Sequence, residues 1–500
     1  MNLADLIDRN AAFTPDRTAL RFEGRALSYA AFAHRVAEAA HGLARLGVRR
    51  GDRVAVLAHN HPDTLTLLYA CARLGAMLAP LNWRLTPAEL LFILQDAGAA
   101  VLAVGEASAS ALSPLTAALP GLRLVGLDFA PDGGEPFDAL LGGAGGGVHG
   151  DLEARLLLVY TSGTTGRPKG AVLTGAALLA NGVMSQHMHG LTGGDQVLTV
   201  LPLFHVGGLN IQTTPALHLG ATVTLHARFD PGATLTTIAA DRPTLTVLVP
   251  STLQALVEHP GWPEADLSGL RAVATGSSSV PQRLVDAFTD RGVPVLQVYG
   301  STETCPIAVY TRLGADPAPP DSTGHPGLLC EAMVADDAGA ELPPGASGEV
   351  LVRGPNVLLE YWGNPAATAA ALHDGWFRTG DIGIRSPDGS FAIGDRRANL
   401  IVSGGENVYP AEVERALLEH PGVAEAAVIG RPDPRWQRVP VAFVVCRRGH
   451  APSAEALVAH LRGQLAGFKV PRTIRFVGSL PRNAMGKVQH FLLRDEPTNQ

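Results

Sequence analysis

Apolar and polar positions alternate along the first four-fifths of the chain in a rhythm of strand followed by helix. Residues 53–58 have the pattern of a strand and residues 62–74 that of a helix. The rhythm is clearest where a strand at 271–275 is followed by a helix at 281–290 and a second strand at 293–299. Such alternation is typical of parallel sheets covered by helices on both faces, so we expect an α/β fold.

The last part of the chain has a different pattern. Short β-like runs at 349–353 and 390–393 lead into an α+β tail whose first helix begins at Pro410, where the missing N–H costs nothing. We therefore predict a large domain over residues 1–397, made of helix-flanked sheets plus a small β-barrel-like part. A small, mobile α+β domain is predicted over residues 398–500, a normal size for an independent unit.

Composition narrows the function mainly by exclusion. Hydrophobic residues make up 46% and charged residues 17% of the 500 positions, as in an ordinary globular protein. The net charge of −7 argues against nucleic acid as a partner, and we expect neither a secretory leader nor a membrane span. The four cysteines are scattered without metal-ligand spacing, so we expect a protein of the reducing cytoplasm. A small molecule is the expected binding partner.

Lysine is rare in this sequence. Of the 39 basic side chains only three are lysine: Lys169, Lys469 and Lys487. A coding bias toward arginine explains why surface basic residues are arginine rather than lysine. A compact ammonium on a flexible stem, however, serves functions that a planar guanidinium does not. The surviving lysines are therefore candidates for a functional role.

The strongest local motif is YTSGTTGRPKG at residues 160–170, which follows an apolar strand at 156–159. Glycines and hydroxyls at this density leave backbone N–H groups free to surround phosphate oxygens, and Lys169 adds a mobile positive charge. The motif is not a Walker A loop, because Arg167 and Pro168 separate the last glycine from the lysine. The sequence therefore indicates a phosphate-binding loop of another type.

Further motifs give the chain a resemblance to the adenylate-forming superfamily, which includes acyl-CoA synthetases, stand-alone adenylation domains and firefly-type luciferases. The resemblance runs from about Tyr160 to Lys487, because the motifs follow the order of that family. They are YGSTE at 299–303, WFRTGD at 376–381, GDRR at 394–397, SGGENVYP at 403–410 and PRNAMGK at 481–487. The implied cofactors and co-substrates are ATP, Mg²⁺ and coenzyme A.

The resemblance implies a nucleotide site assembled from these motifs. In the family pattern Tyr299 stacks on adenine, Thr302 approaches the α-phosphate and Glu303 holds Mg²⁺. Asp381 accepts hydrogen bonds from the ribose hydroxyls, and Arg396 contacts the ribose or phosphate. The other residues implied to bind nucleotide are Thr161 (also an implied metal ligand), Ser162, Gly163, Thr164, Thr165, Gly166, Lys169, Gly276, Ser277, Ser278, Gly300 and Ser301.

The resemblance also implies a reaction in two halves. A carboxylate attacks the α-phosphate of ATP to give acyl-AMP and pyrophosphate, and Lys487 bridges the two anions as they approach. The thiol of coenzyme A then displaces AMP, after the small domain has rotated about a hinge at Ala398. Unlike the usual family pattern, this hinge has neither a lysine nor an aspartate. The turn implied to line the pantetheine tunnel is Gly404, Gly405 and Glu406.

The acyl pocket is implied by a segment that begins at Leu203. His205 is expected either to contact the carboxylate or to pack in the core, and the glycines after it leave room for a chain or a ring. Valine at position 298 has no charge with which to pair a second carboxylate of the substrate, so we expect a monocarboxylate rather than a dicarboxylate. The expected pocket residues are His205, Val206, Gly207, Gly208 and Val298, and the expected catalytic residues are Lys487, Thr302, Glu303 and His205.

The predicted function is an ATP-dependent carboxylate–CoA ligase for an apolar monocarboxylate, either a medium- to long-chain fatty acid or an aryl acid such as ferulate. A stand-alone adenylation enzyme that loads a carrier protein would share these motifs, and so would a luciferase-like oxygenase. A non-catalytic nucleotide sensor is a third alternative, although retention of Lys487 with Glu303 and Asp381 argues against it. The sequence leaves open whether the protein is a homodimer.

Overall fold

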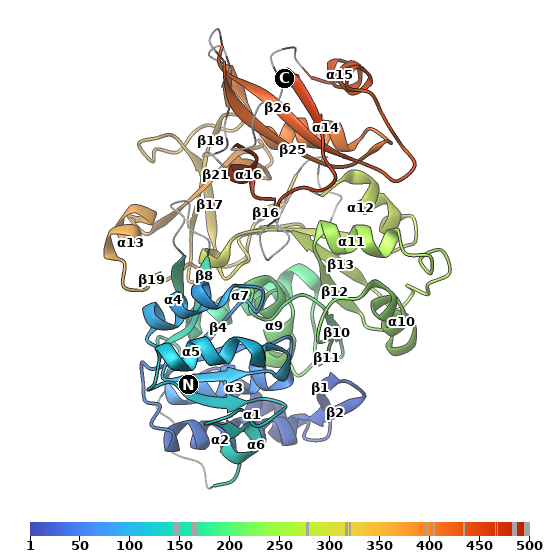
Figure 1. Ribbon diagram of the computed structural model, residues 1–500. Helices are drawn as coiled ribbons and strands as arrows, with labels where there is room; N and C mark the ends of the chain where they lie inside the picture. Colours follow the sequence, from blue (N-terminus) through green and yellow to red (C-terminus); the bar gives the residue numbers. More distant parts are fainter. Residues whose placement is uncertain are drawn as a thin grey trace.

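The computed structural model consists of a large lower part and a small domain above it (Figure 1). It describes residues 1–143, 150–161, 168–276, 280–315, 319, 322–396, 399, 401–403, 406–433, 436–465, 467, 469–482 and 488–494. Within these residues no helix combines the length and the apolar character that a membrane crossing requires. The predicted boundary at Ala398 lies outside them, between the last strand of the large part and the first strand of the small domain.

Two sheets form the body of the large part. The first has the strand order β16-β15-β14-β13-β12-β10-β11-β1-β2 and the second β19-β9-β8-β4-β3-β5-β6-β7. The strands of the first sheet are β1 Thr18–Phe22, β2 Arg25–Ser28, β10 Gln196–Thr199, β11 Thr222–Leu225, β12 Leu245–Leu248, β13 Ala272–Gly276, β14 Val295–Tyr299, β15 Val309–Tyr310 and β16 His325–Pro326. Those of the second are β3 Arg53–Leu57, β4 Met77–Pro80, β5 Val101–Val104, β6 Arg123–Gly126, β7 Glu135–Pro136, β8 Arg155–Thr161, β9 Lys169–Thr174 and β19 Glu360–Tyr361.

Two further sheets are smaller. The third sheet holds β17 Glu331–Ala335, β18 Ser347–Arg353, β20 Leu372–His373, β21 Trp376–Arg385 and β22 Phe391–Arg396, and all of its pairings are antiparallel. Val309, Val334 and Phe391 join it to the edge of the first sheet. The sheet of the small domain holds β23 Ile401–Ser403, β24 Glu406–Val408, β25 Val423–Asp433, β26 Gln437–Cys446 and β27 Thr473–Phe476.

Helices cover both faces of each large sheet, as the sequence predicts. The largest apolar core lies between the two sheets and takes side chains from α1, α2, α3, α7 and α9. Helices α4 and α5 cover the outer face of the second sheet, and α10, α11 and α12 cover that of the first. The helices are α1 Ala4–Phe13, α2 Tyr29–Arg45, α3 Pro62–Leu74, α4 Pro87–Ala97, α5 Leu112–Ala118, α6 Phe137–Leu140, α7 Gly175–His189, α8 Val206–Asn210, α9 Thr213–His218, α10 Pro231–Asp241, α11 Pro250–Val257, α12 Gln282–Thr289, α13 Pro365–Ala371, α14 Pro410–Leu418, α15 Ala454–Arg462 and α16 His490–Arg494.

Local sequence signals explain where several of these helices begin and end. Helix α4 begins at a capping box, in which Thr86 and Glu89 satisfy each other's backbone N–H groups, and it ends at Gly98 in the left-handed conformation. The predicted helix start at Pro410 is confirmed. The predicted parallel arrangement holds for the centre of both large sheets, but β8 and β9 are antiparallel, so the motif at 160–170 joins two strands of a hairpin.

A histidine at the end of α9, whose ring nitrogens are both buried, makes the fold sensitive to acid. Both ring nitrogens of His218 are buried without a hydrogen-bond partner among the described residues, and burial lowers its pKa to about 4. In the unfolded chain the ring takes up a proton near pH 6.5. Acidification from pH 7 to pH 5 should therefore cost the folded protein about 2 kcal/mol through this group.

Replacing His218 with phenylalanine should remove this loss of stability, because the phenylalanine ring has no nitrogen that can take up a proton. The difference in free energy of unfolding between pH 7 and pH 5, measured by urea titration, should shrink by about 2 kcal/mol. The matched control is His34→Gln, since the His34 side chain is exposed and should leave the difference unchanged. An unchanged difference in the His218 variant would contradict the explanation.

Candidate functional site

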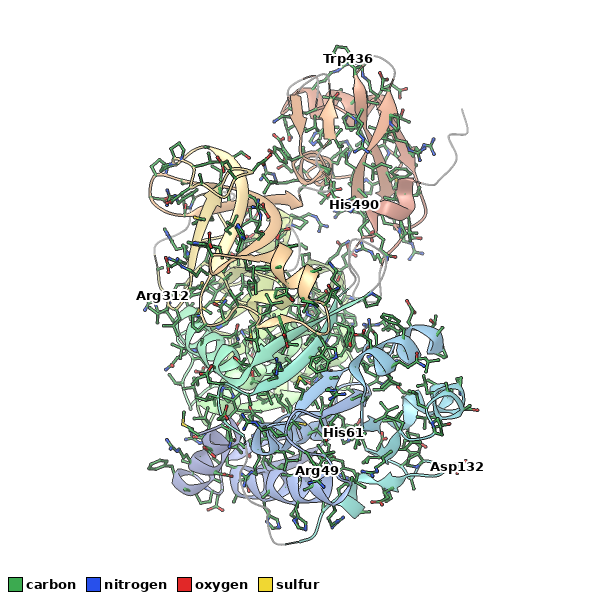
Figure 2. All side chains as sticks on the ribbon, turned by 90° about the vertical axis from the view of Figure 1, so that its left-hand side faces the viewer. Arg49, His61, Asp132, Arg312, Trp436 and His490 are labelled. Carbon is green, nitrogen blue, oxygen red and sulfur yellow. The ribbon has the colours of Figure 1, made fainter. Side chains whose placement is uncertain are left out.

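A large cleft with a volume of about 3760 Å³ lies between the large part and the small domain. The carboxyl ends of β12, β13 and β14 line one side, and the third sheet, α14 and the segments around α16 line others. Figure 2 shows His490 at the face of the small domain that is turned to the large part, and Trp436 at the opposite end. Ligands of open α/β sheets bind at the carboxyl ends of the strands, so this cleft is the candidate site.

Two glycines at the ends of β13 and β14 pack closely on backbone at the edge of the cleft. A Cβ atom on Gly300 would lie 1.7 Å from the carbonyl oxygen of Pro306, and one on Gly276 would lie 2.3 Å from that of Val298. No side chain fits at these distances. Gly276 is therefore held against the backbone of β14, and Gly300 against the backbone of the segment that follows β14.

Tyr299 and Asp381 meet in the cleft. The Tyr299 hydroxyl, at the end of β14, donates a hydrogen bond of 2.7 Å to Oδ2 of Asp381 on β21. Asp381 is also paired across the third sheet with the backbone of Arg396 on β22. The sequence predicts all three residues to contact the nucleoside, and the fold brings them together from separate strands.

Asp381 is held in place by a bulge in β21. Gly380 has a φ of +72°, and its N–H donates to Oε1 of Glu349 at 3.1 Å. Both Nε and Nη2 of Arg378 donate to Oε2 of the same carboxylate. The Thr379 hydroxyl accepts from the Asp381 N–H at 3.0 Å. Glu349 is buried, and the sequence analysis did not identify it; its one signal is a glutamate within the apolar run at 349–353.

Replacing Glu349 with glutamine should move Asp381 out of place, because the amide cannot accept hydrogen bonds at both ends as the carboxylate does. We expect KM for ATP to rise about tenfold, equivalent to one lost charge-assisted hydrogen bond. The matched control is Glu331→Gln, which breaks the exposed pair with Arg353 on the same sheet and should change KM less than twofold. Equal effects from both variants would contradict the positioning role.

Glu303 and Lys169 are joined through a tyrosine. The Tyr361 hydroxyl donates to Oε1 of Glu303 at 2.8 Å, and the Lys169 ammonium lies 5.5 Å from the centre of the Tyr361 ring. The backbone oxygen of Glu303 accepts from the Leu358 N–H at 2.7 Å. Strand β19, which holds Tyr361, pairs with β9 and so links the loop at 160–170 to the YGSTE motif.

The donor set of the site fits Mg²⁺ bound partly by ATP. Glu303 offers a carboxylate to the cleft, which Thr302 and Thr161 also line. The Thr161 hydroxyl is 3.4 Å from the backbone oxygen of Lys169. Among the described residues no group of three or more histidine, cysteine, aspartate or glutamate side chains gathers as a metal cluster. Mg²⁺ commonly binds one or two carboxylates together with phosphate oxygens, which this arrangement allows.

The acyl segment lies on the cleft wall with one exception. Nδ1 of His205 accepts from the Gly207 N–H at 2.9 Å, and His205, Gly207 and Gly208 all line the cleft, as does Val298. The prediction for Val206 needs correction, because its side chain is fully buried in the core between the two sheets. Phe204, from the segment expected to line the acyl site, is on the apolar wall, and the residues there that the sequence analysis did not identify are Ile211, Val247 and Val249.

Gly207 and Gly208 were expected to leave room for the acyl group, but close packing around them accounts for glycine at these positions. A Cβ atom on Gly208 would lie 2.3 Å from the backbone oxygen of Pro202, and one on Gly207 would lie 3.0 Å from Nδ1 of His205. Glycine is therefore required at position 208, where α8 packs on the preceding backbone, whereas a Cβ atom on Gly207 would need the His205 ring to shift slightly. The room for an acyl group comes from the surrounding cleft.

Several predicted site residues fall outside the described part of the chain. They are Ser162, Gly163, Thr164, Thr165, Gly166, Ser277, Ser278, Gly404, Gly405 and Lys487. Arg396 and Glu406 are described only as backbone of β22 and β24. Lys169, Gly276, Gly300, Ser301 and Thr302 line the cleft.

Family models match most of this chain. The model described as AMP-binding enzyme covers residues 7–362, and the model described as AMP-binding enzyme C-terminal domain covers residues 412–487. The chain belongs to the AMP-binding enzyme family. The resemblance to adenylate-forming enzymes is thereby confirmed. The predicted boundary at 398 falls between the two matched segments.

Named relatives of this AMP-binding enzyme match it over nearly its whole length. An indoleacetate–CoA ligase of Aromatoleum aromaticum is 46% identical over 493 residues, which is 98% of this chain and 97% of the relative. A feruloyl-CoA synthase of an Amycolatopsis species is 43% identical over 481 residues, 96% of each chain. The solved structure of the anthranilate CoA ligase AuaEII with anthranoyl-AMP superposes with a TM-score of 0.92 at 29% identity, covering 99% of this chain and 96% of that one.

Proposed function

We propose that this AMP-binding enzyme is an ATP-dependent carboxylate–CoA ligase whose substrate is an aryl or arylalkyl monocarboxylic acid. The observation that carries the proposal is the joining, in one cleft, of the Tyr299–Asp381 pair, the Glu303–Tyr361 pair and an apolar wall. The ligase activity also has the support of the named CoA ligases with which the chain aligns almost end to end.

In the first half-reaction a carboxylate oxygen attacks the α-phosphorus of ATP and pyrophosphate leaves. Tyr299 and Asp381 would hold the nucleoside, and Lys169 would meet the phosphates from the side of β9. When bound at Glu303, Mg²⁺ would supply positive charge that offsets the phosphate charge. Lys487 would neutralise the two approaching anions, because charge developing in the transition state must be met by a preorganised cation.

In the second half-reaction the thiol sulfur attacks the acyl carbon and AMP leaves. Gly404, Gly405 and Glu406 would line the path of the thiol after rotation of the small domain. One direct link between the domains lies next to this turn: the Tyr409 hydroxyl is 3.2 Å from Oγ of Ser347 on β18. Rotation would break this hydrogen bond. The hinge at Ala398, the rotation and the cytoplasmic location stay predictions from the sequence.

The preference for an aromatic acid rests on the walls of the cleft and on the relatives. Phe204, Ile211 and Val247 are apolar residues that line the same cleft as His205. Flat rings gain from offset or edge-on contact with an aromatic side chain such as Phe204. Two relatives are named for indoleacetate and ferulate, and the anthranilate ligase structure holds anthranoyl-AMP.

Pyrophosphate release across a panel of acids tests the proposal. The panel is acetate, malonate, octanoate, palmitate, benzoate, anthranilate, ferulate and indole-3-acetate, each with Mg-ATP and with or without coenzyme A. We expect CoA-dependent turnover with the aromatic acids and at least about tenfold lower kcat/KM with the fatty acids, the discrimination of roughly 1.4 kcal/mol that one pocket contact provides. Turnover confined to fatty acids would overturn the substrate class. Pyrophosphate release without CoA turnover would point to a carrier protein as acceptor.

A further inference from the structure

The described chain is tied together on both sides of the segment that holds Lys487. The described residues on either side of it, Arg482 and Val488, form an antiparallel bridge, and the Gln489 N–H donates to the Pro481 oxygen at 2.8 Å. Arg482, Val488 and Gln489 all line the cleft. The residues on both sides of the lysine segment therefore line the same cleft as the predicted nucleotide residues.

A largely buried pair fixes the chain immediately after this segment. Nε2 of His490, the first residue of α16, lies 2.8 Å from Oε1 of Glu414 on α14, and the two side chains are 17% and 18% exposed. Because a carboxylate oxygen can only accept, the imidazole N–H must be the donor. The same Glu414 oxygen accepts from the Val428 N–H of β25 at 2.7 Å. Glu414 is thus anchored to the small-domain sheet and in turn anchors His490.

Helix α14 connects this pair to the domain interface. It begins at Pro410, directly after Tyr409, which is hydrogen-bonded to Ser347 of the large part. A single short helix therefore has one end at the contact between the domains and carries the glutamate that holds the chain after the lysine segment. On the other side of the segment, Arg482 pairs with Glu425 at 2.6 Å, but these two side chains are each 34% exposed. Exposed pairs of this kind contribute little.

We propose that the Glu414–His490 pair is a positioning device for Lys487 in the acyl-AMP-forming half-reaction. The proposal rests on the proposed function, because it assumes that Lys487 bridges the carboxylate and the α-phosphate. His490 lies three residues after Lys487, so the pair fixes the chain at a point close in sequence to the lysine. A displacement of about 1 Å is enough to slow a reaction that depends on alignment by up to 10²-fold. The thioester half-reaction does not use the lysine and should not depend on the pair.

The test compares the two half-reactions in variants of the full-length protein. Pyrophosphate release from Mg-ATP and acid reports the first half, and thioester formation from supplied acyl-AMP and coenzyme A reports the second. In His490→Phe and in Glu414→Gln we expect kcat of the first half to fall about tenfold, with KM for ATP and acid within twofold and the second half unchanged. Because the residues act as a unit, the double variant should be no slower than the slower single variant.

Two further variants make the result specific. His490→Arg keeps an N–H donor toward Glu414 and should retain at least half of the wild-type rate. Glu425→Gln breaks the exposed pair at the other side of the same segment and should stay within twofold. Equal loss of both half-reactions in the His490 and Glu414 variants, failure of His490→Arg to restore the rate, or an equal effect of Glu425→Gln would each overturn the positioning role.

Lys487→Ala, measured in parallel, separates this inference from the proposed function. If Lys487→Ala leaves pyrophosphate release intact, the role of the lysine is wrong and the positioning role is overturned with it. If Lys487→Ala abolishes release while the pair variants keep the wild-type rate, the proposed function stands and the positioning role alone is overturned.

Discussion

Lys487→Ala should slow pyrophosphate release by at least about 10²-fold while thioester formation from supplied acyl-AMP stays near the wild-type rate. The first half-reaction brings a carboxylate against a phosphate, and removing the cation that meets them leaves two anions in repulsion. The second half-reaction has a neutral thioester as product and no such encounter. Stopped-flow release of pyrophosphate and a thiol-consumption assay measure the two halves separately.

Lys469→Ala is the matched control for this experiment. Lys469 is the other lysine of the small domain, and its ammonium lies 2.6 Å from Oε1 of Glu412. Its removal breaks a partly exposed ion pair and should leave both half-reactions within about threefold. Parallel loss of both halves in Lys487→Ala would mean that the variant is misfolded or that the lysine has another role.

Asp381→Ala should weaken ATP binding about 10²-fold. The carboxylate is expected to accept hydrogen bonds from both ribose hydroxyls, each worth about 1.5 kcal/mol when the acceptor is charged, and a loss of about 3 kcal/mol corresponds to that factor. Isothermal titration with ATP measures it directly. The control is Tyr299→Phe, which removes the 2.7 Å hydrogen bond to Asp381 but keeps the ring and the carboxylate, and should change the affinity only a few-fold.

The ligand offers an independent check on the role of Asp381. Wild-type protein should lose affinity when ATP is replaced by 2′,3′-dideoxy-ATP, because the hydroxyls are gone. Asp381→Ala should bind the two nucleotides equally, since the partner of those hydroxyls is already missing. A variant that still discriminates between them as strongly as the wild type would exclude Asp381 as the ribose ligand.

The α/β class and several elements could be predicted because their signals are local. Proline at the first position of α3 and α14, and apolar periods of the right length, are enough to place those helices. Long-range pairing has no such signal. Strand β1 is parallel to β11, with Leu20 opposite Val223, and nothing near residue 20 indicates a partner two hundred positions away. The hairpin of β8 and β9 was likewise not predicted, because a strand pattern alone does not give direction.

The residues of the candidate site likewise divide into those that local motifs predict and those that only long-range contacts reveal. Residues within the motifs, such as Tyr299 and Asp381, were identified because the motifs are contiguous. Glu349 and Tyr361 were not, because they act through contacts with residues 31 and 58 positions away. Val206 was assigned to the pocket because its neighbours are, but a helix turns successive side chains in different directions and this one points into the core.

Because the sequence contains only three lysines, amine-reactive labelling of side chains reports on three defined positions. Each amine-reactive label on a side chain reports one place: Lys169 above the Tyr361 ring, Lys469 beside Glu412, or Lys487, the lysine proposed for catalysis. Peptide mass spectrometry after brief acetylation can therefore follow three sites without any engineered probe. Protection of Lys169 alone by a nucleotide, or of Lys487 only when a carboxylate is also present, would trace the order in which the cleft fills.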